Sequence, residues 1–121
     1  MKIENIKFKA KSFLDGAWVQ GDLVHKEDVA ICILRNGFNV SEVDPSTVCQ
    51  FTGLKDCEGN EIWEGDIISS PHFERVATVK WDDSLCGFKC SDVTGNINFS
   101  FTAIAHCSEW SIVGNEFDKK K

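Results

Sequence analysis

Hydrophobic and polar residues alternate along several short stretches of the chain. From Ile6 to Lys11 every apolar residue is followed by a lysine, and this is the pattern of a β-strand with one buried and one solvated face. Residues 76–81 and 97–102 repeat the alternation. Residues 29–34 are instead continuously apolar and rich in β-branched side chains, which predicts a strand buried on both faces. No segment sustains the period of an amphipathic helix.

Turn signals separate these stretches. Asp15-Gly16 and Asn36-Gly37 are typical of hairpin turns, and Gly21 indicates a bulge or bend inside a strand over residues 17–25. A single helical turn is expected at 103–106. Many short strands divided by turns favour an all-β sandwich or barrel. The full set of expected strands covers residues 6–11, 17–25, 29–34, 38–40, 48–52, 61–63, 67–68, 75–81, 87–90, 97–102 and 110–113.

Composition narrows the class of protein further. A chain of 121 residues that is 42% hydrophobic has the size of one compact domain, which we place at residues 1–118, followed by a basic, frayed tail at 119–121. The polar N-terminus lacks an apolar leader and no apolar run reaches membrane-spanning length. We therefore expect a cytoplasmic protein with no membrane partner, whose six cysteines are reduced thiols.

The net charge of −6 is concentrated in one segment. Residues 42–66 carry seven acidic side chains against the single lysine Lys55, so this segment alone accounts for the whole excess. An acidic chain lacks the general attraction for phosphates that supplies most non-specific nucleic-acid affinity. Nucleic acid is therefore a disfavoured partner.

The residues with metal-binding chemistry form no convincing site. Cys86 and Cys90 together with His106-Cys107 have the ligand types of a zinc site, but neighbouring residues of a strand point to opposite faces. Separate core cysteines explain the same residues. Glu61, Glu64 and Asp66 offer oxygen ligands for a hard cation, without the spacing of an EF-hand, and a turn with a solvated acidic rim explains them equally. We expect no metal and no cofactor.

Catalytic motifs are also missing from the sequence. There is no nucleophile elbow, no catalytic-cysteine signature and no glycine-rich phosphate loop, so we expect no catalytic residues and no enzymatic activity. Tryptophans usually pack in cores, but one of the four is a candidate for exposure at an interface. These are Trp18, Trp63, Trp81 and Trp110.

One long stretch resembles the signature of the YopX proteins, a family of small phage and prophage proteins. The matching residues are Gln50-Phe51-Thr52-Gly53-Leu54-Lys55-Asp56, Gly59 and Glu61-Ile62-Trp63-Glu64-Gly65-Asp66-Ile67. Residues 6–10, 18–23, 79–82 and 112–117 are similar to further segments of the family. Lys9 stands where the family has arginine, and the tryptophan usual after Ala10 is missing.

The resemblance implies a mostly β fold with a barrel-like core, a phage or prophage origin and a setting in the cytoplasm of the bacterial host. No catalytic residue and no established biochemical role can be transferred from it. The expected architecture is a single small all-β domain of coiled antiparallel sheets with an SH3-like or related β-barrel core and at most short helical turns.

The signature also has a physical interpretation. Residues 52–56 are expected to form a tight loop, Gly59 to close a hairpin, and Gly65 to bend the chain where a side chain would clash. The structural positions are Gly53, Gly59, Trp63 and Gly65. Five charged positions that packing does not require are candidates for a partner-binding surface, with a purely structural role as the alternative. They are Lys55, Asp56, Glu61, Glu64 and Asp66.

Two functions remain after these considerations. The first is a non-enzymatic phage accessory protein that acts through protein–protein contacts with an unknown partner or as a homo-oligomer. The alternative is a nucleic-acid-associated module in phage replication or regulation, for which the fold class offers only an analogy. This alternative requires a basic concave face built from Lys7, Lys9, Lys11, Lys80 and Lys89.

Overall fold

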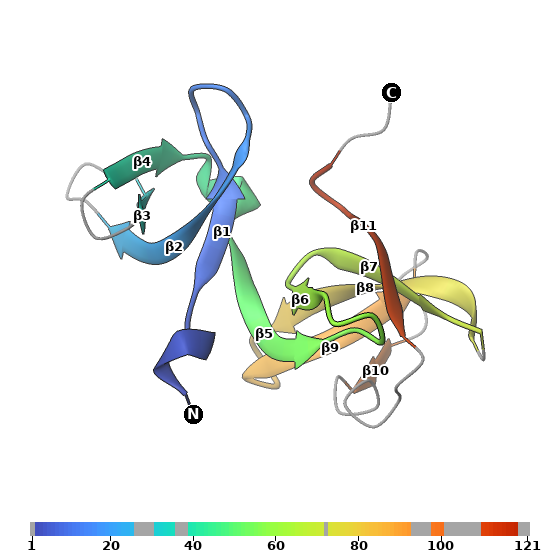
Figure 1. Cartoon of the computed structure of the whole chain (residues 1–121). Coiled ribbons are helices and arrows are strands. Elements are labelled where there is room, and N and C mark those ends of the chain that lie inside the picture. Colours follow the sequence, from blue (N-terminus) through green and yellow to red (C-terminus); the bar gives the residue numbers. More distant parts are fainter. Residues whose placement is uncertain are drawn as a thin grey trace. The chain divides into compact units, whose positions relative to one another are not determined.

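A computed structural model describes most of the chain (Figure 1). The described residues are 2–25, 31–35, 39–71, 73–92, 98–100 and 110–118. Their helical content consists of two 3-10 turns, η1 (Ile3–Asn5) and η2 (Pro45–Thr47), and most of the remaining residues are strands. The expected all-β class is therefore confirmed. The expected Asn36-Gly37 hairpin and the helical turn at 103–106 lie outside the described residues.

The chain divides into two compact units, residues 1–51 and 52–121. Strand β5 (Cys49–Lys55) passes through the boundary between them without interruption. The expectation of one domain over residues 1–118 stays a prediction, and the tail at 119–121 lies outside the described residues.

The first unit holds most of a six-stranded antiparallel sheet in the order β4-β3-β2-β1-β5-β6, whose last strand, β6 (Glu61–Trp63), belongs to the second unit. Its core consists of Ala10, Val19, Ile33 and Val43. The neighbours Cys32 and Ile33 are both buried, which confirms that this apolar run forms a strand covered on both faces. The strands are β1 (Phe8–Lys11), β2 (Trp18–His25), β3 (Ile31–Arg35), β4 (Asn39–Val43) and the first residues of β5.

The turn between β1 and β2 confirms one expectation, and β2 itself corrects another. Gly16 has a φ of 72° and donates its N–H to the Ser12 carbonyl at 2.9 Å, while the Ser12 N–H donates to the Ala17 carbonyl at 2.9 Å, so Asp15-Gly16 lies in a hairpin turn as expected. Gly21, expected to mark a bulge or bend, lies in a strand that pairs regularly on both sides, so there is no bulge at this position. A Cβ at this position would overlap the Leu34 carbonyl, so the glycine permits close approach of β2 and β3.

The first unit curls back on itself at one end of β4. An isolated bridge joins Ser12 to Val43, and the Phe13 N–H donates to the Glu42 carbonyl at 3.1 Å. Contact between β1 and β4 is limited to this end because the chain turns away immediately afterwards into the Gly16 turn. Within the described residues neither sheet closes into a barrel, so the expected barrel core is seen only as this partial closure.

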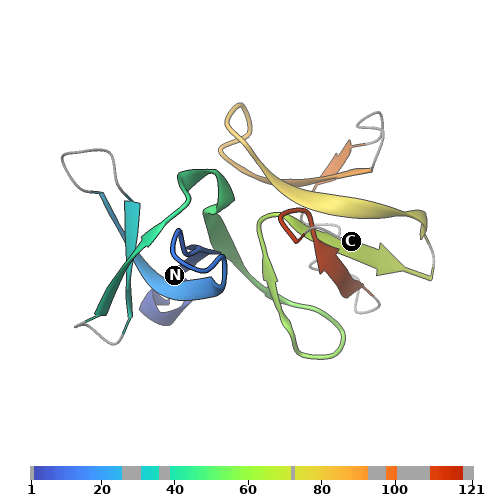
Figure 2. The ribbon, with the colours of Figure 1, turned by 90° about the horizontal axis from the view of Figure 1, so that it is seen from above.

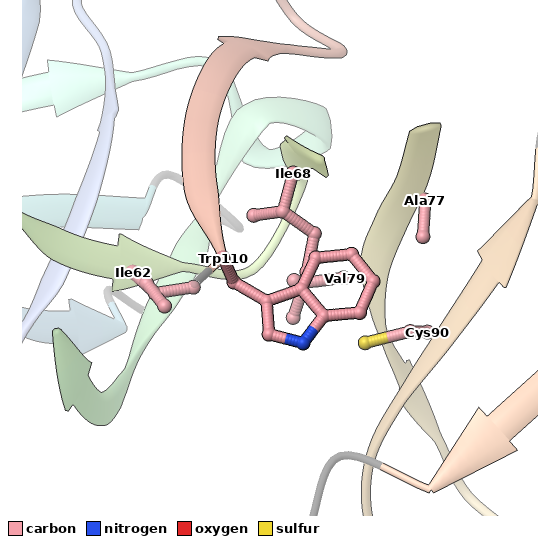
Figure 3. Packing of buried hydrophobic residues seen from close by; sticks show 6 residues of the cluster. All are labelled: Ile62, Ile68, Ala77, Val79, Cys90 and Trp110. Carbon is pink, nitrogen blue, oxygen red and sulfur yellow. The ribbon is translucent and has the colours of Figure 1, made fainter. Parts of the chain in front are cut away.

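The second unit contains an antiparallel sheet in the order β10-β9-β8-β7-β11. Figure 2 shows the long β8 bending as it crosses this unit. Buried side chains from four strands point toward one another around Trp110 (Figure 3): Ile62, Ile68, Ala77, Val79 and Cys90. The strands are β6 (Glu61–Trp63), β7 (Asp66–Ser70), β8 (Phe73–Asp82), β9 (Gly87–Asp92), β10 (Asn98–Ser100) and β11 (Ser111–Asn115).

The expectation of a tight loop at residues 52–56 is wrong, because most of these residues belong to a strand. Strand β5 continues to Lys55, because Thr52 Oγ1 donates to the Ile62 carbonyl of β6 at 2.6 Å and Leu54 packs on the core of the second unit. The turn follows at residues 56–60. Gly59 closes it with a φ of 87° and an N–H bond of 3.1 Å to the Asp56 carbonyl.

Candidate functional site

The turn between β5 and β6 is built around the Asp56 carboxylate. Its Oδ1 accepts the backbone N–H groups of Glu58 at 2.9 Å and Asn60 at 2.8 Å, which is the local pattern of an Asx turn. Its Oδ2 accepts the N–H of Ile112 at 3.2 Å. The Cys57 N–H adds a bond of 2.9 Å to the Trp110 carbonyl. One carboxylate therefore shapes the turn and attaches it to β11.

Asp56 is a buried charge in a site built to receive it. Its relative exposure is 8%, and burial by itself raises the pKa of a carboxyl group. The backbone N–H groups of Asn60, Ile112 and Glu58 outweigh this effect and hold the pKa of Asp56 below its usual value. The carboxylate is thus ionised at neutral pH and bound by the fold.

A second buried carboxylate organises the turn between β6 and β7. Asp66 Oδ2 accepts the Trp63 N–H at 2.7 Å, and its Oδ1 accepts the Asn115 side-chain amide at 2.9 Å. Gly65, the residue before Asp66, donates its N–H to the Val79 carbonyl at 2.7 Å, and its own carbonyl accepts the Glu116 N–H at 2.8 Å. This turn therefore joins β6, β7, β8 and the end of β11.

Gly65 has no room for a side chain. Its φ is 88°, and a Cβ would lie 3.0 Å from Phe117 Cε2, which is the clash that the signature suggests. Gly53 and Gly59 have nearly the same φ, but a Cβ at either would meet nothing within 4 Å. Trp63 is buried at 5% exposure.

Alanine at Gly65 should cost more stability than alanine at Gly59. Both changes place a Cβ on a backbone with positive φ, which costs about 1–2 kcal/mol, and only Gly65→Ala also displaces the Phe117 ring. We expect losses of about 1 kcal/mol for Gly59→Ala and about 2–3 kcal/mol for Gly65→Ala in denaturant unfolding. Equal losses would show that the Phe117 contact carries no weight.

The five candidate surface charges do not form one surface. Asp56 and Asp66 are buried at 8% and 3% exposure, so the premise that packing does not require them is wrong: both carboxylates hold turns together. Lys55 is exposed, whereas Glu61 and Glu64 are half-buried and have interactions within the fold. A partner-binding role stays a prediction for these three residues.

Another acidic residue of this segment has a local structural role. Asp44 accepts the Ser46 N–H at 3.0 Å and the Ser46 hydroxyl at 2.8 Å at the start of η2, as capping aspartates do. Asp44, Asp56 and Asp66, three of the seven acidic side chains in residues 42–66, are therefore turn or cap residues. The acidic segment is less of an open charged surface than its composition indicates.

The lysines of the alternative, basic-face hypothesis contact aromatic rings or acids. Lys9 and Lys11 lie over the Trp18 ring, at 4.7 and 5.3 Å from its centroid, and Lys7 lies 4.8 Å over Phe51. In the second unit Lys80 is 4.0 Å from Glu116 and Lys89 is 3.1 Å from Asp82. The nucleic-acid alternative stays a prediction, with part of its positive charge offset by neighbouring acids.

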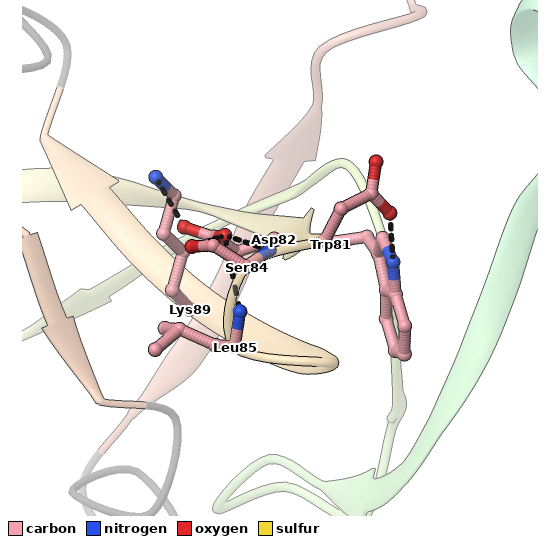
Figure 4. A network of polar contacts seen from close by, with 6 residues as sticks. Trp81, Asp82, Ser84, Leu85 and Lys89 are labelled. Carbon is pink, nitrogen blue, oxygen red and sulfur yellow. Dashed lines mark hydrogen bonds and ion pairs between the residues drawn. The ribbon is translucent and has the colours of Figure 1, made fainter.

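The hairpin between β8 and β9 is a polar network at the surface (Figure 4). Asp82 Oδ1 accepts the Ser84 hydroxyl at 2.6 Å, and the Ser84 hydroxyl together with the Lys89 ammonium lowers the pKa of Asp82 to about 2. Trp81 is 42% exposed, and its Nε1 donates to Asp83 Oδ1 at 2.7 Å. Trp81 is thus the exposed tryptophan, whereas Trp63 and Trp110 are buried and Trp18 is half-buried.

The cysteines occupy two environments. Cys57 and Cys86 are exposed, whereas Cys32, Cys49 and Cys90 are buried, and all five are free thiols. None of these five takes part in a disulfide in the described part of the chain, and the expectation of reduced thiols stays a prediction. Cys90 lies in the core (Figure 3), whereas Cys86 lies exposed on the hairpin. The other two candidate zinc ligands, His106 and Cys107, lie outside the described residues.

Alkylation should distinguish these thiols. Burial raises the pKa of Cys90 to about 12, so its reactive thiolate form is nearly absent near neutral pH. In the native protein we expect iodoacetamide to modify Cys57 and Cys86 and to leave Cys90 unmodified until the chain is unfolded, as read by peptide mass mapping. Native-state modification of Cys90 at the rate of Cys57 would contradict this core.

The first unit carries an exposed apolar feature that the sequence analysis missed. Phe13, Leu14 and Val40 line a groove of about 390 Å³ together with Ser12, Ser41 and Glu42. The three apolar residues, Phe13, Leu14 and Val40, are 59%, 94% and 50% exposed, respectively. One signal was available: two large apolar residues directly precede the Asp15-Gly16 turn, where a hairpin leaves little core to receive them. We call these six residues the β4 groove.

The arrangement defines a small all-β protein in which the most distinctive sequence segment forms turns that join β6 to β7, β8 and β11. The chain belongs to the YopX protein family, whose model matches residues 5–120. Comparison with curated proteins gives no match. The described part of the chain has no helix long and apolar enough to cross a membrane. Its His, Cys, Asp and Glu side chains nowhere gather in threes as metal ligands do.

Proposed function

We propose that this protein is a non-enzymatic phage or prophage accessory protein that acts in the bacterial cytoplasm by binding other protein chains, with self-association as one form of that binding. Membership of the YopX family supports the phage connection. The lack of any catalytic motif in the sequence supports a binding role over an enzymatic one.

The observation that carries this proposal is the β4 groove. Leu14 is 94% exposed and Phe13 is 59% exposed on the same turn, and Val40 lines the same groove. Scattered exposed apolar residues are ordinary, but a contiguous concave apolar patch is typical of a protein-binding site. The groove lies entirely within the first unit, so its geometry depends on that unit alone.

The test combines an assembly measurement with affinity capture. Light scattering on a size-exclusion column over a range of protein concentrations reports self-association. Capture from lysate of phage-infected cells reports other partners, and each captured protein is compared between wild type and Leu14→Ser.

The matched control is Leu85→Ser, which changes a leucine that is 64% exposed on the second unit. We expect the wild type to self-associate or to capture a partner protein. Leu14→Ser should abolish this self-association or capture, and Leu85→Ser should leave it unchanged. A monomer at every concentration together with no capture that depends on Leu14 would overturn the proposal.

A further inference from the structure

Strand β4 is the outermost strand on one side of its sheet. The segment after β1 covers only its C-terminal end, through the Ser12 bridge to Val43 and the Phe13 bond to Glu42. In the described residues no strand pairs with the outer edge of β4 before Glu42. An uncovered strand edge is a template for pairing with another extended chain.

The alternation of an antiparallel ladder identifies which backbone groups face outward. The Glu42 carbonyl points away from β3, because it accepts the Phe13 N–H at 3.1 Å. Hydrogen-bonding groups point to the same edge at every second residue, so the Val40 N–H and carbonyl also point outward. Val40 therefore presents backbone groups at the edge and a 50% exposed side chain to the groove.

Charge decides between the possible occupants of this edge. Glu42 is the one charged residue among the six that line the groove, and its side chain is exposed. A second copy of the chain would bring a further net charge of −6, so a basic segment of another protein fits this edge better than a second copy does. A partner segment with lysine or arginine beside apolar residues matches both the carboxylate and the apolar walls.

From these features we infer that the β4 groove binds a short extended segment of another protein as an added β-strand. The segment pairs its backbone with Val40, places an apolar side chain against Phe13 and Leu14, and directs a basic side chain to Glu42. Backbone pairing supplies affinity, and alternate side chains supply specificity in this mode of recognition. This inference rests on the proposed function and names its partner chemistry.

The experiment uses the full chain and a fluorescent capped peptide of alternating lysine and valine, titrated by fluorescence anisotropy. A glutamate–valine peptide tests charge, and a lysine–valine peptide with its central amides methylated tests backbone pairing. We expect binding of the lysine–valine peptide, with affinity at least roughly tenfold weaker for each of the other two, the size of one lost charge pair or a few hydrogen bonds.

Two protein variants locate the binding. Val40→Asp should abolish it, and Glu42→Lys should reverse the preference in favour of the glutamate–valine peptide. Leu85→Ser should leave both affinities unchanged. Circular dichroism and unfolding curves that match the wild type establish that the two exposed positions do not act through folding.

The outcomes separate this inference from the proposed function. The inference is overturned if the lysine–valine peptide does not bind. It is also overturned if the affinity is unchanged by amide methylation and by the Val40→Asp and Glu42→Lys changes. The proposed function survives that result if Leu14→Ser still abolishes assembly or capture. A monomer without Leu14-dependent capture overturns the proposed function even if the isolated peptide binds.

Discussion

Replacing Asp66 with alanine should lower the free energy of unfolding by about 3–5 kcal/mol, the range for breaking a buried charged hydrogen-bond network. The change removes the acceptor of the Trp63 N–H and of the Asn115 amide, at 2.7 and 2.9 Å. Both donors lie among residues that are about 5% exposed, where water cannot readily replace the carboxylate. Chemical unfolding followed by tryptophan fluorescence measures the loss.

The matched control is Glu58→Ala in the same acidic segment. The Glu58 side chain is exposed, and its role in the β5–β6 turn is through its backbone N–H, which alanine keeps. We expect a change within about 0.5 kcal/mol for Glu58→Ala. If Asp66→Ala cost no more than Glu58→Ala, the Asp66 turn would not hold the second unit together.

Asp56→Ala should cost about 3–4 kcal/mol at neutral pH, because three backbone N–H groups lose a charged acceptor. The cost should also depend on pH. The folded-state pKa of Asp56 lies below the ordinary value of 3.8, so its carboxylate stabilises the fold above that pH and loses this effect as pH falls through the folded pKa. The difference between wild type and variant should therefore shrink in acid.

The measurement is a series of unfolding curves for wild type and Asp56→Ala from neutral pH to below the ordinary carboxyl pKa. Asp44→Ala serves as the control, since it removes an exposed cap whose loss costs about 1 kcal/mol. A wild-type advantage over Asp56→Ala that grows with acidity would contradict the assigned direction of the pKa change.

Local patterns were sufficient to predict much of the fold. The apolar run around Cys32 and Ile33 is buried on both faces, and the Asp15-Gly16 dipeptide forms the expected turn. Ala77 and Val79 face the core as the alternation over residues 76–81 predicts, while Trp81 continues the same face beyond the edge of the core. Each of these features depends on residues close together in the chain.

The carboxylates of the signature could not be interpreted in this way. The partner of Asp56 in β11, Ile112, is 56 residues away, and the partner of Asp66, Asn115, is 49 residues away. A charged residue in a glycine-containing turn looks solvent-exposed until the strand that covers it is known. The same limit explains the loop wrongly placed at 52–56, because Thr52 finds its acceptor in β6.

The β4 groove escaped prediction for a related reason. Phe13 and Leu14 stand beside a recognisable turn, but Val40 and Glu42 reach them only because the first unit curls until Ser12 meets Val43. The sequence places the two halves of the groove almost thirty residues apart, as positions 12–14 and 40–42. The curl of the sheet, rather than any motif, creates the concave surface.

We propose that the two units have separate roles: the signature turns hold the second unit together, and the β4 groove of the first unit binds partners. Amide hydrogen exchange of the full chain, with and without the lysine–valine peptide, tests both parts at once. We predict slower exchange on binding at Val40 and Glu42 and unchanged exchange across residues 55–66. Protection of residues 55–66 with no change in β4 would contradict the claim and return the binding role to the acidic segment.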